Sequence, residues 1–220
     1  MTGLNSPNFL AVSGTDLYVA NALNGTVGKY NANTGATLNA AFLSGLSQPN
    51  GIALFGNALL VVNYASNSIG AYDAATGATI NPSLVTGLLG PSGIAVSGGR
   101  LFVANQAGNS VGVYDATTGA TINPALVTGL GQPNAITVFG SSLFVTNGFG
   151  RNTIGVYDAT TGAAINTELV SKLDAPLGIV VLPEPSTIWC AVAALATAGT
   201  RRRRRTRRGL MPACRGSGPR

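Results

Sequence analysis

The chain has 220 residues and a net charge of +6, but this charge is unevenly distributed along it. Residues 1–182 carry four basic and six acidic side chains, whereas residues 183–220 carry nine arginines and one acidic residue, Glu184. The basic balance therefore belongs to the C-terminal end, and the mildly acidic body offers no basic face for a phosphate backbone, which excludes a nucleic-acid-binding body.

The chain contains a repeat of about 42 residues, and its first residues match the end of one repeat unit. Thr2-Gly3-Leu4 matches Thr86-Gly87-Leu88 and Thr128-Gly129-Leu130, and Met1 stands where the later units have valine. We therefore expect the chain to open inside a repeat, with upstream repeats missing. The N-terminal signal peptide that export requires is expected to be missing with them. A genuine four-unit protein is the alternative.

Residues 1–182 form a body built from a repeat of about 42 residues. Successive prolines and tyrosines keep this period, with one extra residue before the last of each set: Pro7, Pro49, Pro91, Pro133 and Pro176, and Tyr30, Tyr72, Tyr114 and Tyr157. The resulting units are 7–48, 49–90, 91–132 and 133–175, and 176–182 opens a fifth. Such a period predicts a repeat architecture in which neighbouring units stack.

Each unit contains four short apolar segments, as unit 91–132 illustrates. Gly93–Val96, Leu101–Ala104 and Ser110–Tyr114 have the length and alternation of β-strands. A weaker last strand contains Thr121–Ile122 and Leu126–Val127 and is broken by Pro124. Because proline within a strand confines it to a sheet edge, this strand is predicted at the edge. No stretch of the body has helical spacing.

A turn follows the third strand of each unit. In unit 91–132 it runs from Asp115 to Gly119. Aspartate accepts hydrogen bonds from the backbone two residues on, and glycine supplies a positive φ. Because the units are equivalent, substitution of Gly77, Gly119 or Gly162 is expected to have the same effect on stability.

Four strands per unit, with the last at an edge, predict an all-β fold, a β-propeller of four four-stranded blades. Residues 7–182 also resemble the YVTN and NHL families of propeller repeats, most clearly at LFVTNGFGRNTIGVYDATTG, Leu143–Gly162. Four blades are enough to close a ring, since propellers have about 4–8. The resemblance implies a fold and no particular activity, because propellers host many functions.

The body offers little for catalysis. The chain has no histidine, which excludes Ser-His-Asp and Cys-His sites, and Cys190 and Cys214 both lie outside the body. Three aspartates occupy the repeated turn, where unit 7–48 has an asparagine: Asp73, Asp115 and Asp158, with Asn31. The remaining carboxylates, Asp16, Glu168 and Asp174, lack symmetry. We therefore predict no catalytic residue, metal site or cofactor.

A repeated asparagine ends the second strand of each unit: Asn21, Asn63, Asn105 and Asn147. Carboxamides repeated around a ring could face a ligand and hydrogen-bond sugars. The structural alternative is that each asparagine closes a turn by bonding its own backbone. The repeated tyrosines are predicted to pack between blades with their hydroxyls at the rim.

The C-terminal end has three parts in a fixed order. Pro183-Glu184-Pro185 comes first, and the uncharged run then extends to Thr200. As a helix this run is about 24 Å long, against about 30 Å for a hydrocarbon core, so it predicts a short hydrophobic helix and a marginal span. Seven arginines follow and would stay on the cytoplasmic side: Arg201, Arg202, Arg203, Arg204, Arg205, Arg207 and Arg208. A disordered basic tail after a short surface helix is the alternative.

This order resembles the PEP-CTERM sorting signal of Gram-negative bacteria, over residues 183–208. The resemblance implies that an exosortase-type enzyme reads Pro183, Glu184 and Pro185 while the inner membrane holds the precursor transiently. Export to the cell surface or the extracellular matrix would follow, in a setting linked to exopolysaccharide and biofilm. Residues 209–220 extend beyond the usual end of the signal and are predicted to be a disordered tail.

The sequence therefore predicts an exported, non-catalytic propeller that acts as a scaffold or a recognition protein. Its expected partners are the processing enzyme, the inner membrane as a transient host, and a polysaccharide or another surface protein. Nucleic acid is not among them. The alternative is a secreted propeller hydrolase or lactonase whose active residues lie in the missing upstream repeats.

Overall fold

The structure is a computed structural model, and it describes residues 1–148 and 151–182. These residues contain sixteen β-strands in four antiparallel sheets. Each sheet consists of four strands that are consecutive in the sequence and neighbours in the sheet, so each is a simple meander. We number the sheets as blades 1 to 4 in chain order.

The blades have the same strand lengths, seven, six, six and seven residues. Blade 1 contains β1 (Pro7–Ser13), β2 (Asp16–Asn21), β3 (Thr26–Asn31) and β4 (Thr37–Leu43). Blade 2 contains β5 (Pro49–Phe55), β6 (Ala58–Asn63), β7 (Ser68–Asp73) and β8 (Thr79–Val85). Blade 3 contains β9 (Pro91–Ser97), β10 (Arg100–Asn105), β11 (Ser110–Asp115) and β12 (Thr121–Val127). Blade 4 contains β13 (Pro133–Phe139), β14 (Ser142–Asn147), β15 (Thr153–Asp158) and β16 (Ala164–Val170).

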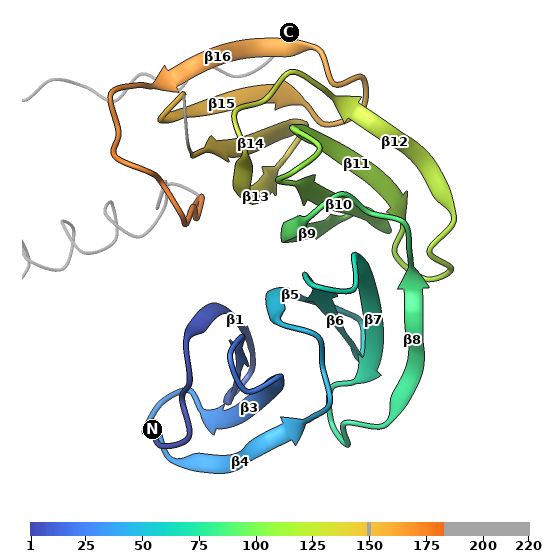
Figure 1. Cartoon of the computed structure of the whole chain (residues 1–220), viewed down its shortest axis with the longest axis vertical. Helices are drawn as coiled ribbons and strands as arrows, with labels where there is room; N and C mark the ends of the chain where they lie inside the picture. Colours follow the sequence, from blue (N-terminus) through green and yellow to red (C-terminus); the bar gives the residue numbers. More distant parts are fainter. Residues whose placement is uncertain (149–150, 183–220) are drawn as a thin grey trace, which may run out of the picture. The chain divides into compact units, whose positions relative to one another are not determined.

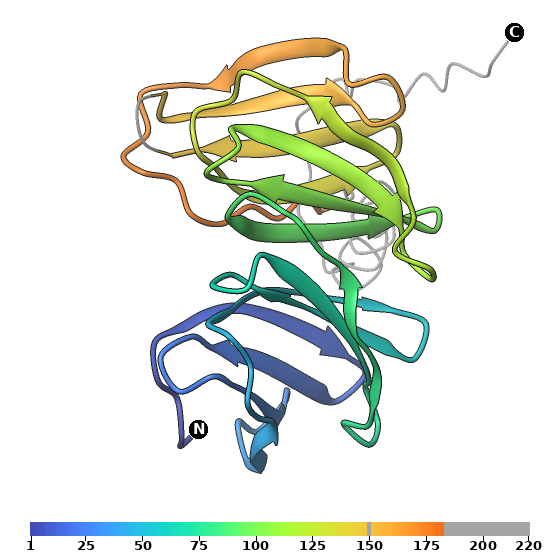
Figure 2. The same ribbon diagram turned by 45° about the vertical axis from the view of Figure 1, so that its right-hand side comes forward.

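The first strand of each blade lies innermost, and these strands pack in order, β1 on β5, β5 on β9 and β9 on β13. The described part of the chain is thus a four-bladed β-propeller, and the predicted fold is confirmed. Within these residues β1 and β13 share no comparable packing, and the blades form an arc that is open on one side (Figures 1 and 2). Blade 1, in blue, and blade 4, in olive-yellow to orange, stand at its two ends.

The fourth strand of each blade lies at the sheet edge, as predicted from proline, but proline does not break it. Strand β12 runs continuously through Pro124, and its pairing with β11 shifts register on both sides of Val113. Blades 1 and 4 show the same shifts, although they have Ala40 and Thr167 in place of this proline. The repeated feature is an asparagine whose Oδ1 accepts a hydrogen bond from the backbone N–H two residues on, at 3.0 Å in every blade: Asn39, Asn81, Asn123 and Asn166. This asparagine-anchored bulge, not proline, bends the edge strand.

The hydrophobic core lies between blades. Between blades 2 and 3, Leu60, Ile69 and Val85 from blade 2 pack with Leu101 and Tyr114 from blade 3. The interface between blades 3 and 4 has the same kinds of residue at the equivalent positions. Burial raises the pKa of three repeated tyrosines that pack at the three interfaces between blades, Tyr72, Tyr114 and Tyr157. The large apolar clusters thus form where one blade covers the next.

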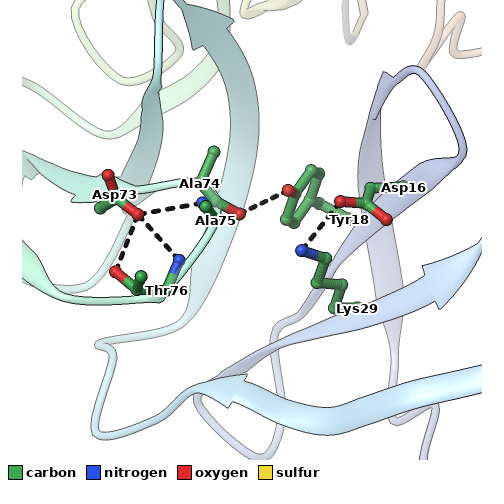
Figure 3. Close-up of polar contacts among 7 residues, drawn as sticks. All are labelled: Asp16, Tyr18, Lys29, Asp73, Ala74, Ala75 and Thr76. Atoms are coloured by element: carbon green, nitrogen blue, oxygen red, sulfur yellow. Dashed lines mark hydrogen bonds and ion pairs between the residues drawn. The ribbon is translucent and has the colours of Figure 1, made fainter.

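The interface between blades 1 and 2 adds a charged group to this pattern (Figure 3). Lys29 Nζ lies 2.8 Å from Asp16 Oδ2 and 5.4 and 5.1 Å from the ring centres of Tyr18 and Phe42. The Tyr18 hydroxyl donates a 2.5 Å hydrogen bond to the carbonyl oxygen of Ala74 in blade 2. Burial alone would lower the pKa of Lys29, but the hydrogen bond and charge of Asp16, together with Tyr18, raise it. The ammonium group therefore stays charged while its stem packs between aromatic rings.

Candidate functional site

A cavity of about 560 Å³ lies where innermost strands approach one another. Blade 1 contributes Pro7, Asn8, Phe9 and Leu10, and the segment Leu177–Val180 lines it as well. Asn50 of β5 and Asn134 of β13 complete the wall together with Gln106, which follows β10. The volume lies within the range of sites that hold small ligands, about 300–1,000 Å³.

The lining of this cavity is uncharged. Its polar side chains are the carboxamides of Asn8, Asn50, Gln106 and Asn134, and the rest of the wall is apolar or glycine. A smaller cavity of about 230 Å³ shares Asn8, Asn50 and Gln106 with it and adds Gln48 and Tyr64. Carboxamides both donate and accept hydrogen bonds, so this group of side chains suits a neutral ligand rich in hydroxyls.

Blade 3 interrupts the carboxamide series. The positions 8, 50 and 134 are one or two repeat periods apart, and the missing member is Ser92. Ser92 is buried, and its hydroxyl lies within hydrogen-bonding distance of the carbonyl oxygens of Pro133 (3.0 Å) and Asn134 (2.9 Å). The serine therefore ties β9 to β13 and holds the Asn134 backbone, while Gln106 supplies the carboxamide from blade 3.

The four asparagines predicted from the sequence, Asn21, Asn63, Asn105 and Asn147, are buried instead. Each Oδ1 accepts a hydrogen bond from a backbone N–H sixteen residues earlier, at 3.1–3.4 Å, in the loop that enters the innermost strand: Asn5, Ser47, Leu89 and Gly131. The role seen is structural: Oδ1 accepts from this entering loop, and Nδ2 of Asn21 and Asn147 donates to the hydroxyls of Thr26 and Thr153 across the asparagine's own hairpin. Ligand contact at these positions stays a prediction and would require the loops to open.

The repeated turn aspartates are occupied by their own turns. Asp115 Oδ1 accepts from the backbone N–H groups of Thr117 (2.9 Å) and Thr118 (2.8 Å) and from the Thr118 hydroxyl (2.9 Å). The backbone and hydroxyl hydrogen bonds of Thr118 lower the pKa of Asp115, and equivalent bonds lower that of Asp73 and Asp158. Asn31 accepts the same three hydrogen bonds in blade 1, so the turn requires the oxygen and not the charge.

The other carboxylates are scattered. Asp16 pairs with Lys29 at the first interface, and Glu168 lies on the exposed strand β16. Within residues 1–148 and 151–182 no three histidine, cysteine, aspartate or glutamate side chains lie close enough together to hold a metal ion.

The predicted sorting residues Pro183, Glu184 and Pro185, the arginines of 201–208 and the hydrophobic helix lie outside the described residues. Among residues that the structure does describe, no helix has the length and apolar character to cross a membrane.

Comparison with known proteins supports the fold but identifies no family or activity. No protein-family model and no curated protein matches the chain. Among solved structures, a nidogen/laminin complex matches with a TM-score of 0.64 and 18% identity, over 76% of this chain and 65% of that one. Virginiamycin B lyase from Staphylococcus aureus matches with a TM-score of 0.56 and 23% identity, over 71% and 54% of the two chains. The computationally designed Ika8 protein matches with a TM-score of 0.57 and 17% identity, over 80% and 53%.

The chain therefore spans about half to two thirds of the length of these neighbours. At such identities the likeness extends to the propeller fold alone.

Sequence reasoning missed the cavity carboxamides, although a signal for them was present. Asn8, Asn50 and Asn134 directly follow the repeated prolines Pro7, Pro49 and Pro133. Their period matches that of the buried asparagines, so the period alone does not separate the two sets. Strand order separates them, because these three lie on innermost strands and the buried set ends the second strands.

Proposed function

We propose that this propeller is a non-catalytic recognition module that binds a neutral saccharide in the cavity between its innermost strands. The observation that carries the proposal is the lining itself, four carboxamides on an otherwise apolar and uncharged wall. Amide groups can donate to and accept from sugar hydroxyls, and Phe9 and Leu10 offer apolar surface to the ring faces.

The positions of the carboxylates support a binding role. The three repeated aspartates hold turns, and Asp16 is paired with Lys29. A hydrolase needs a positioned acid or base beside its substrate, and the cavity lining contains no ionisable side chain. The proposal is thus recognition without turnover.

The test is binding of the purified chain to arrays of neutral and acidic bacterial polysaccharides, followed by calorimetry on the best oligosaccharide. The substitutions Asn50→Ala and Asn134→Ala should each weaken binding by about tenfold, since each removes hydrogen bonds to the ligand. Asn57→Ala is the matched control, because Asn57 is exposed at a hairpin turn outside the cavity. Equal binding by all three variants would place the site elsewhere. A preference for acidic glycans would contradict the proposal of a neutral ligand.

The proposed location of this module is the cell surface or the extracellular matrix, reached through the PEP-CTERM-like segment 183–208. This part of the proposal rests on the order Pro-Glu-Pro, uncharged run and arginines. A fusion to a signal peptide, tagged at both ends and expressed in an exosortase-containing host, tests it. The propeller tag should reach the surface or medium while the C-terminal tag stays behind, and Glu184→Ala should keep both tags in the membrane fraction. If both tags travel together in the unaltered protein, the sorting role fails.

A further inference from the structure

A third cavity, of about 330 Å³, lies where blade 2 meets blade 3. Its lining combines Tyr64 and Leu89 with small residues, among them Ala65, Gly90 and Ala107. Tyr64 also lines the 230 Å³ cavity, which in turn shares three side chains with the 560 Å³ cavity. We call the three the outer, middle and central cavities. Because neighbouring cavities share lining residues, together they form a path that leads from the innermost strands outward past Tyr64.

The path keeps the uncharged character of the central cavity. All the described residues that line the three cavities lack a charged side chain. The middle and outer cavities are enclosed by three consecutive blades, blades 1 to 3, and by the loops between them. A neutral ligand seated on the carboxamides can therefore continue along the path without meeting a charge.

Tyr64 directly follows the buried asparagine that ends the second strand, and its equivalents are Ala22, Gln106 and Gly148. The backbone at this position is the same in every blade. Its N–H donates to the carbonyl oxygen of the residue that precedes the proline of the first strand, at 2.8–3.2 Å: Ser6, Gln48, Gly90 and Gln132. The accepting residue has a positive φ in all four blades, between 48° and 60°.

The side chain at this position differs in every blade, whereas the asparagine before it is repeated in all four. The fold uses the backbone hydrogen bond here, so it leaves the choice of side chain free. Ala22 and Tyr64 line the middle cavity, and Gln106 lines both the middle and the central cavity. This repeat position therefore sets the chemistry of the path, and blade 2 places an aromatic ring there.

Tyr64 and Leu89 suit a sugar chain that leaves the central cavity. Their side chains are 36% and 61% exposed. An aromatic ring offers a flat apolar face to the C–H face of a sugar, and its hydroxyl can bond at the rim. Gly90 keeps the outer cavity open, because a Cβ there would lie 2.9 Å from the Cβ of Ala107. Blades 2 and 4 have glutamine at the position of this glycine.

We propose that the ligand is a segment of a polysaccharide chain, which continues from the central cavity across Tyr64 into the outer cavity. This inference rests on the saccharide-binding function proposed above and adds the length and the direction of the ligand. A single sugar would fill the central cavity alone. A chain also contacts the tyrosine and the apolar surface beyond it, which lie on the same uncharged path.

Calorimetry on the full chain tests the dependence of binding on ligand length. The probes are fragments of one to six sugar units from neutral glucans, mannans and galactans, and from the neutral polysaccharide that binds best on the array. The affinity should rise by about tenfold or more from the two-unit to the six-unit fragment, because only longer fragments reach Tyr64 and the outer cavity.

Variants along the path should affect long fragments selectively. Tyr64→Ala should weaken binding of the six-unit fragment by about tenfold and change that of one- and two-unit fragments by less than about twofold. Tyr64→Phe keeps the ring and should retain most of the affinity. Leu89→Ser, which copies the residue of blade 2 at this position, should weaken only the longest fragments.

Phe139→Ala is the matched control and should leave binding unchanged at every length. Phe139 is an aromatic residue at the end of β13, 49% exposed, and it lines none of the three cavities. All these side chains are exposed, so circular dichroism should show an unchanged fold.

The outcomes separate this inference from the function on which it rests. If no fragment binds, or if Asn50→Ala and Asn134→Ala leave binding of short fragments unchanged, the central site is wrong and the path fails with it. If short fragments depend on both asparagines but the affinity does not rise with length, the central site stands and the path is wrong. Equal weakening of all lengths by Tyr64→Ala, or long fragments insensitive to both Tyr64→Ala and Leu89→Ser, would also overturn the path alone.

Discussion

The turn after the third strand has different surroundings in blade 3, which another blade precedes, and in blade 1. Gly119 in blade 3 and Gly35 in blade 1 have nearly the same backbone, with φ of 72° and 70°. A Cβ added at Gly119 would overlap the backbone carbonyl oxygen of Leu84 in the preceding blade, whereas one at Gly35 would meet only Met1 side-chain atoms at 3.8–4.0 Å. Equivalent residues in a repeat therefore share a backbone but not surroundings, and the presence of a preceding blade makes the difference.

The same comparison applies to Leu10 and Ile94, which occupy one repeat position, and it predicts the largest effect. Ile94→Ala should lower the free energy of unfolding by about 3 kcal/mol, because it leaves a cavity between blades 2 and 3. Leu10→Ala should cost less than about 1 kcal/mol when measured by urea unfolding, since its side chain is mostly exposed. Similar losses for both variants would show that the Leu10 side chain is packed in solution.

The turn glycines give the next prediction. Gly119→Ala should destabilise by about 2–3 kcal/mol, from the positive φ together with the overlap on the Leu84 carbonyl. Gly35→Ala should cost about 1 kcal/mol, because only the backbone conformation is strained.

Gly162→Ala should lower the free energy of unfolding by as much as Gly119→Ala, since the added Cβ would overlap the Leu126 carbonyl oxygen. The loss for Gly77→Ala should lie between those for Gly35→Ala and Gly119→Ala, because the added Cβ would lie 2.9 Å from the Phe42 carbonyl oxygen. The repeat alone predicted equal losses of stability at the turn glycines, whereas the structure predicts graded losses, which thermal or urea unfolding can measure. Equal losses at Gly35 and Gly119 would contradict it.

The charged group at the first interface predicts a smaller effect. Lys29→Ala should cost about 1 kcal/mol, because it leaves the partly buried Asp16 without its partner. Changing Asp16 and Lys29 together to alanine, the residues that blade 2 has at these positions, should cost less than the single change. A double-mutant cycle at low and high salt measures the coupling, and additive losses would show that the pair contributes nothing.

The turn aspartates predict the smallest effect, a dependence on pH. Their pKa values are lowered in the fold from a reference value of 3.8, so the ionised form supports the turn. This stability is present above the unfolded pKa and is lost as the pH falls through the lower folded pKa.

Replacing Asp73, Asp115 and Asp158 by asparagine, as blade 1 already has at Asn31, should therefore reduce the loss of stability between about pH 5 and pH 2. Urea unfolding across this range provides the measurement. An unchanged pH profile would mean that other carboxylates dominate acid unfolding.

Much of the fold could be predicted from the sequence because its causes are local. The alternation of apolar residues gave the strands, and Asp115 and Gly119 predicted a turn that the structure confirms in detail. Pro124 predicted an edge strand, which is correct, although Asn123 makes the bulge. Repetition then required blades to stack, since a single sheet cannot bury both faces.

The candidate site was less predictable, because it depends on which strand lies innermost. Asn21 and Asn8 have the same period and the same carboxamide, yet Asn21 is buried against the loop at Asn5 while Asn8 lines the cavity. The direction of a side chain in a propeller follows from its place across the sheet, which the period does not encode.

The sequence by itself thus determined the blades, their turns and their tendency to stack, since each follows from a pattern within 42 residues. Only the tertiary structure decided which carboxamides face open space and which apolar residues lack a neighbour. Leu10 and Ile94 occupy the same repeat position, and their exposures differ because a blade precedes β9 and none of the described blades precedes β1. Burial depends on what lies across an interface, and a local pattern does not contain that information.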